Sequence, residues 1–187
     1  MRRERIIMTG NELIEQIKAL GFEGDADSTD RLYSVITLSM RLIAAEYPKI
    51  LSKEIVKQRG EVLTVSPSEL HNCKMLAKSP VFKEGVPYSS VFILDGTATL
   101  PKEAEGVFTV RYVENLPAFC DSMCEGELCL DPCAQHLLPL LVSALFWQDD
   151  EPEKARLYMQ QYQDGVRLLR SQRIMNNPSV YNCENGW

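Results

Sequence analysis

The chain has 187 residues, of which 45% are hydrophobic and 25% are charged, and its formal net charge is -6. This length and composition are typical of one globular domain with an insertion, and they argue against general disorder. The acidic balance argues against a general nucleic-acid-binding protein, because neutralising phosphates requires a basic surface.

The chain starts with basic residues, but only Ile6, Ile7 and Met8 follow as an apolar run, which is too short for a signal-peptide core. The most apolar later stretch is interrupted by Pro139 and is bounded by Gln148, so we expect no membrane span. We therefore expect synthesis in the cytoplasm, with mostly reduced cysteines.

Two amphipathic helices are the first predicted elements. Thr9 and Glu12 have the spacing of a capping box, and Gly21 marks the end of the helix that they begin. A second helix is expected from about residue 27 to about residue 46, because Pro48 disfavours helical geometry in the residue before it.

From residue 53 to residue 130 the sequence changes to short apolar stretches with β-branched residues, separated by Gly, Pro and Asp. The strongest turn signal is Asp95-Gly96, because these residues tolerate the positive φ angles of a two-residue hairpin. Residues 70–82 are ambiguous between a loop and a poor strand. The strand candidates are residues 54–58, 61–65, 90–94, 97–100, 107–113 and 127–130.

Residues 136–169 predict a helical hairpin. Its first helix, up to Phe146, is apolar nearly all round, which requires burial by several neighbours or by other subunits. Its second helix begins at the acidic cluster 149–153, where carboxylates and Pro152 favour a helix N-terminus. One stripe of this second helix carries Tyr158, Tyr162, Val166 and Leu169.

The order helix, helix, strands, helix, helix predicts an α+β fold. We expect the N-terminal helices (9–48) and the C-terminal hairpin (132–173) to pack together as one domain. Residues 49–131 would form an inserted small antiparallel β-sandwich or barrel. The tail, residues 174–187, contains Tyr181 and Trp187, which are costly to leave in water, so it docks either on its own domain or on a neighbour.

Charge is distributed unevenly towards the C-terminus. Residues 112–153 contain nine Asp or Glu and no Lys or Arg. The helix that follows carries Lys154, Arg156, Arg167, Arg170 and Arg173, opposed only by Asp164. These stretches are either solvated faces or acidic and basic surfaces that meet across a subunit contact.

A cysteine cluster is the one candidate metal site. Cys120, Cys124, Cys129 and Cys133 are separated by three, four and three residues, and His136 follows closely. Structural zinc sites usually have a longer gap between two ligand pairs, and we expect Cys129 in a strand and Cys133 at a helix start. Small buried residues or exposed loop thiols are therefore the favoured interpretation, and a zinc-binding interaction module is the alternative.

Signals for catalysis are missing. The sequence has no nucleophile elbow, no glycine-rich phosphate loop, and only two histidines, His71 and His136. The carboxylates at 149–153 are better explained as helix caps than as an acid and base pair. We predict that the chain is not an enzyme and binds no cofactor, with an unfamiliar hydrolase that uses His136 as the remaining alternative.

Three parts of the chain resemble the neck proteins of tailed bacteriophages and prophages, the group of head–tail connectors or adaptors. The resemblance covers residues 10–171 and lies in the order and pattern of elements. Its three parts are residues 11–21 with 45–48, residues 91–101 with 106–112 and 116–117, and residues 137–146 with 149–150 and 153–169.

The resemblance implies a structural virion subunit whose helical bundle holds a β module. Such subunits form a ring, twelve-fold in neck adaptors, which joins the portal and head to the tail. The implied partners are copies of the chain, portal and tail proteins, and weakly bound DNA in a central channel; a tail or baseplate position is the alternative. The residues that we expect at these contacts are Tyr158, Tyr162, Val166, Arg167, Leu169, Arg170, Arg173, Tyr181 and Trp187.

Overall fold

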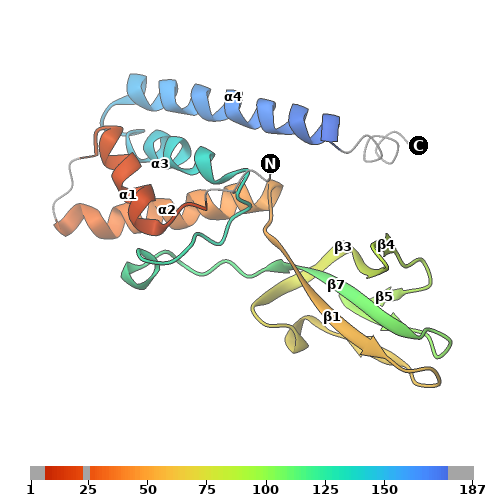
Figure 1. Ribbon diagram of the computed structural model, residues 1–187. Coiled ribbons are helices and arrows are strands. Elements are labelled where there is room, and N and C mark those ends of the chain that lie inside the picture. Colours follow the sequence, from red (N-terminus) through yellow and green to blue (C-terminus); the bar gives the residue numbers. More distant parts are fainter. Residues whose placement is uncertain (1–6, 23–25, 177–187) are drawn as a thin grey trace. The chain divides into compact units, whose positions relative to one another are not determined.

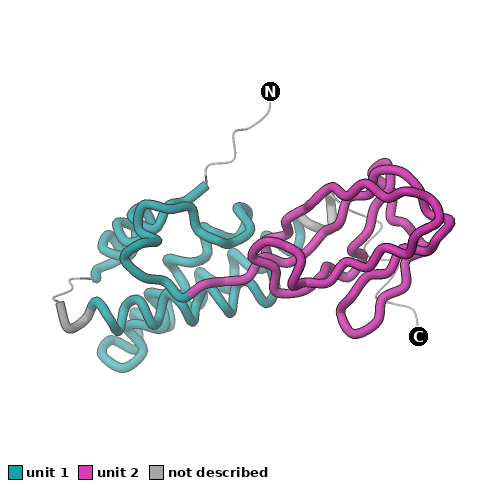
Figure 2. The backbone as a smooth tube through the Cα atoms, turned by 90° about the horizontal axis from the view of Figure 1, so that it is seen from below, with its two compact units in different colours: residues 1–47, 118–187 teal, residues 48–117 magenta. Residues whose placement is uncertain are grey.

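The computed structural model describes residues 7–22 and 26–176, with side chains for residues 7–22 and 29–172. The chain divides into a helical unit, residues 1–47 with 118–187, and a β unit, residues 48–117 (Figure 2). The fold is α+β, with helices at both ends of the chain and antiparallel strands between them, which confirms the predicted class.

Helix α1 (Gly10–Ala19) begins at the predicted capping box. The Thr9 hydroxyl accepts a hydrogen bond from the Glu12 amide at 3.3 Å, and the Glu12 carboxylate accepts one from the Thr9 amide at 2.7 Å. The helix stops before Gly21, whose φ of +100° favours glycine. Helix α2 (Ala26–Glu46) ends two residues before Pro48, as expected.

Helix α3 (Leu138–Phe146) lies at the centre of the helical unit. Helix α4 (Pro152–Asn176) packs along one side of it, and α1 and α2 pack on the other (Figure 1). Seven of the nine residues of α3 are buried. Neighbouring helices of the same chain therefore cover its apolar surface, and the burial of α3 does not require other subunits.

The β unit contains two antiparallel sheets whose inner faces share one core. The core side chains come from both sheets and include Leu76, Leu100 and Phe108. The first sheet has the order β1 (Ile50–Lys57), β7 (Gly106–Glu114), β3 (Cys73–Lys83), β4 (Val86–Pro87). The second has the order β2 (Leu63–Val65), β6 (Thr97–Leu100), β5 (Phe92–Leu94).

Asp95 and Gly96 form the predicted turn between β5 and β6, with φ angles of +49° and +75°. Both angles are positive, as in the type I′ turns that suit two-residue hairpins. The ambiguous stretch is strand β3. Its pairing with β7 shifts register twice, between Cys73 and Met75 and again between Leu76 and Val81, so the alternation that identifies a strand is broken in its sequence.

The strand predicted at residues 127–130 is wrong. Only an isolated bridge joins Thr9 to Glu127, and residues 128–130 are irregular. Backbone hydrogen bonds instead hold this segment against the start of α1, from Gly10 N to Gly126 O (3.1 Å) and from Leu128 N to Met8 O (3.1 Å). The β unit therefore ends at Pro117, and residues 118–131, which we had placed in the β module, belong to the helical unit.

Candidate functional site

The apolar stripe that we predicted on α4 faces its own unit. Val166 and Leu169 are buried, and the hydroxyl of the half-buried Tyr158 donates a hydrogen bond to the Leu20 carbonyl at 2.7 Å. Tyr162 is half-buried, and its burial raises the pKa of its hydroxyl. These four residues stabilise the helical unit, because α3 needs a cover that α4 provides.

The arginines of α4 lie outside this buried stripe. Arg167 and Arg170 are exposed, and each has a carboxylate of the same chain within hydrogen-bond distance. Arg173 lies in α4, but its side chain is outside the described set, and so are Tyr181 and Trp187. The outer face of α4 is thus the part of the predicted contact set that remains on the surface.

Part of the acidic stretch and the basic helix are paired with each other or with neighbouring helices inside one copy. Most of these pairs are well exposed and contribute little to stability, since water and ions screen them. The pairs are Arg31 with Asp149 (3.7 Å) and Asp150 (3.6 Å), Lys154 with Glu151 (3.5 Å), Arg156 with Glu153 (3.1 Å), Arg167 with Asp164 (3.1 Å), and Arg170 with Glu46 (2.8 Å).

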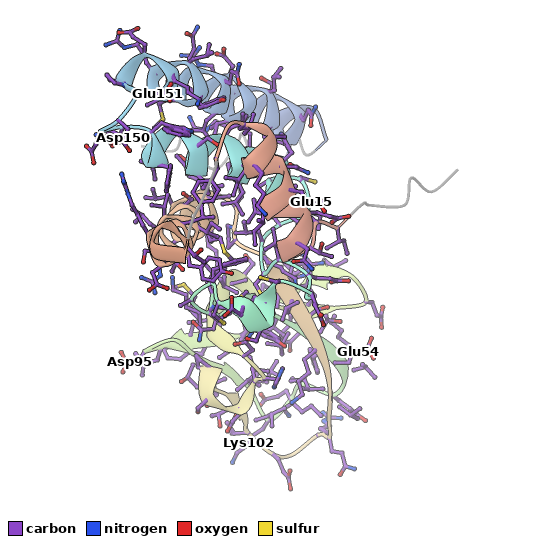
Figure 3. The ribbon with its side chains drawn as sticks, turned by 90° about the vertical axis from the view of Figure 1, so that its left-hand side faces the viewer. Glu15, Glu54, Asp95, Lys102, Asp150 and Glu151 are labelled. Atoms are coloured by element: carbon purple, nitrogen blue, oxygen red, sulfur yellow. The ribbon has the colours of Figure 1, made fainter. Side chains whose placement is uncertain are left out.

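Besides Asp30 on α2, three carboxylates of the helical unit have no such pairing. Glu15 on α1, and Glu125 and Glu127 in the segment that lies against α1, are exposed and make no hydrogen bond or ion pair with any described residue. Figure 3 shows Glu15 projecting outward from α1. We call these three residues the acidic surface.

A groove of about 470 Å³ lies beside Glu15. Its lining includes apolar atoms of Met8, Ala19 and Pro132, together with the carboxylate-bearing side chains of Glu12 and Glu15. Because Glu12 is already used as the helix cap, Glu15 is the free charge at this groove.

A second groove, of about 650 Å³, runs along α2 and residues 118–121. Some of its polar groups bond to each other: the Tyr33 hydroxyl donates to the Asp121 carboxylate at 2.7 Å, and the Phe119 amide donates to the Thr37 hydroxyl at 2.9 Å. The hydrogen bond to Asp121, followed by burial, raises the pKa of Tyr33. These contacts attach the segment to α2.

The cysteines do not gather. Cys120 and Cys124 flank the short helix η2 (Asp121–Met123), Cys129 lies in an irregular bend and Cys133 in a turn, so neither is in the strand or helix start that we expected. Over residues 7–22 and 26–176, no group of three or more His, Cys, Asp or Glu side chains is arranged to hold a metal ion.

The β unit has an exposed apolar edge that sequence reasoning missed. Strand β5 ends its sheet and pairs only with β6, and Phe92, Ile93 and Leu94 are 67%, 45% and 62% exposed. An edge strand with no charge or proline is a template for pairing with another chain. The available signal was the run of four consecutive apolar residues, 91–94, before the turn, which breaks the usual alternation of a half-buried strand.

No family model matches this chain, and no curated protein matches it. Among the helices that the structure describes, none combines the length and the apolar character needed to cross a membrane.

Proposed function

We propose that this protein is a structural subunit of a tailed-phage or prophage virion, which forms a ring in the neck and joins the portal and head to the tail. The position in the virion rests on the resemblance in element order and pattern. The observation that carries the structural role is the apolar edge of β5, because folded proteins that act alone usually protect such edges with charges, proline or a covering element.

Two other edge strands of the β unit are protected in this way, and the third, β2, keeps its apolar residues Leu63 and Val65 half-buried or buried. Strand β1 carries Lys53 and Glu54, and β4 is two residues long and contains Pro87. Strand β5 has neither device, so burial against a neighbouring virion subunit explains its composition. Phe92 and Leu94 lie beside the half-buried Thr99 and Thr97, whereas Ile93 lies beside the fully buried Ala98; Phe92 and Leu94 thus share the face away from the core.

The test is the mass of the full chain in solution, by size-exclusion chromatography with light scattering, alone and with any portal and tail proteins that are encoded beside it. We expect self-association or a complex with the portal. Binding only to tail or baseplate proteins would indicate a position further down the virion. A strictly monomeric chain with no affinity for any of these proteins would contradict the proposal.

The variant Phe92→Lys with Leu94→Lys tests the role of β5 in this assembly. Both side chains are exposed, so the β unit should stay folded while assembly weakens. Val56→Lys is the matched control, because Val56 is an apolar residue that is 77% exposed, on a strand already protected by charge. Equal effects of both variants would argue against a specific role of β5.

A further inference from the structure

The outer face of α4 is built from a repeated motif. Residues 153–157 read Glu-Lys-Ala-Arg-Leu, and residues 164–168 read Asp-Gly-Val-Arg-Leu. The two copies are eleven residues apart, which is three helical turns with a residual rotation of about 20°. Each copy therefore presents the same groups on the same side of the helix, separated by about 16 Å along its axis.

The structure treats both copies of the motif alike. In each, the arginine pairs with the carboxylate three residues earlier at 3.1 Å, and the arginine side chains are 76% and 75% exposed. The leucines that follow, Leu157 and Leu168, are 53% and 65% exposed, although a leucine side chain in water contributes little hydrophobic stabilisation. We call the four residues Arg156, Leu157, Arg167 and Leu168 the Arg-Leu face.

The acidic surface of the same unit has the complementary composition. Glu15, Glu125 and Glu127 lack ionic partners among the described residues, and the groove beside Glu15 offers apolar atoms of Met8, Ala19 and Pro132. An arginine followed by a leucine suits such a site, because the guanidinium pairs with the carboxylate while the leucine covers apolar surface.

The two surfaces point in different directions. The Arg-Leu face is the side of α4 away from α3, and Glu15 projects from α1 on a side that α4 does not occupy (Figure 3). They therefore cannot meet within one copy. Unlike surfaces on one chain that fit each other produce head-to-tail contacts between copies, and these close into rings when the rotation allows it.

From this charge and shape complementarity we infer that the Arg-Leu face of one copy docks on the acidic surface of a second copy. One of the two arginine-leucine pairs in this face places its leucine in the groove and its arginine beside Glu15. Residues 125 and 127 supply carboxylates for the arginine of the other pair. This inference rests on the proposed ring-forming function, for which it names the contact between neighbouring copies.

The test is a charge swap measured as self-association of the full chain by analytical ultracentrifugation. One variant carries Arg156→Glu and Arg167→Glu, and the other carries Glu15→Arg, Glu125→Arg and Glu127→Arg. Each alone should associate at least tenfold more weakly than the wild type, because like charges then face each other. An equimolar mixture should return to within about threefold of the wild type, since each copy then meets a complementary neighbour.

Arg41→Glu is the control, because Arg41 is an exposed arginine on α2 outside both surfaces; it should associate like the wild type. Circular dichroism should show all variants folded, since the altered side chains are exposed. Variants that associate normally, or a mixture that is not rescued, would overturn this inference while leaving the ring-forming function intact. A wild-type chain that stays monomeric, alone and with portal or tail proteins, would overturn both.

Discussion

The hydroxyl of Tyr158 donates a hydrogen bond of 2.7 Å to the backbone carbonyl of Leu20, 138 residues earlier in the chain. Leu20 is the C-terminal cap of α1, where the last carbonyls of a helix have no partner within the helix. Tyr158 supplies one of the missing donors and joins α4 to α1. Its position on α4 is therefore explained by the stability of the helical unit.

Replacing Tyr158 by Phe should lower the free energy of unfolding by about 1 kcal/mol, because the ring stays while the Leu20 carbonyl loses its donor. Urea denaturation followed by circular dichroism measures this loss. Tyr162→Phe is the matched control, since the Tyr162 hydroxyl makes no hydrogen bond in the described structure, and it should change stability by less than about 0.5 kcal/mol. Equal losses in both variants would contradict the assignment.

Gly165→Ala should destabilise the helical unit although alanine is the better helix former. A Cβ at this position would overlap the side chain of Leu137, which is fully buried. The helix propensity gained is about 1 kcal/mol, and overpacking costs about 1 to 3 kcal/mol, so we expect a net loss of about 1 kcal/mol. Thermal unfolding of Gly165→Ala measures this loss, with Gln161→Ala as the control because Gln161 is exposed on the same helix. A rise in the melting temperature of Gly165→Ala would show that Leu137 moves to make room.

Gln135→Leu should cost at least about 2 kcal/mol of unfolding free energy. The buried amide of Gln135 accepts a hydrogen bond from Met8 N at 2.7 Å and donates to the carbonyls of Leu128 and Leu130 at 3.3 Å each. Leucine has a similar volume but leaves three buried backbone groups without partners. Hydrogen exchange should show faster exchange at the Met8 amide, and an unchanged rate there would contradict this role.

The stability of the helical unit should fall at alkaline pH because of Tyr33. Its hydrogen bond to Asp121, followed by burial, raises the pKa of Tyr33 in the folded chain above the ordinary value near 10. The folded chain then keeps a proton that the unfolded chain releases, so this contribution is complete below about pH 10 and is lost as the pH rises towards the folded pKa. Urea denaturation from about pH 8 to about pH 11 should show a steeper decline for the wild type than for Tyr33→Phe; equal slopes would be the contrary result.

The sequence by itself predicted the elements whose signals are local. The capping box of Thr9 and Glu12 and the turn at Asp95-Gly96 depend on residues within three positions of each other, so short-range geometry decides them. The class of the fold also followed from the order of helical and strand periodicities. Strand β3 escaped this reasoning because its register shifts against β7 interrupt the alternation.

Only the tertiary structure decided which side of each element is covered. The sequence places leucine and valine on more than one side of α4. The packing of α3 determines that Val166 and Leu169 are buried and that Leu157 and Leu168 are exposed. It likewise brings residues 118–131 against α1 and α2 and leaves β5 at an open edge. Burial depends on contacts between residues far apart in the chain, and a local pattern specifies the residues of a face without specifying what lies against it.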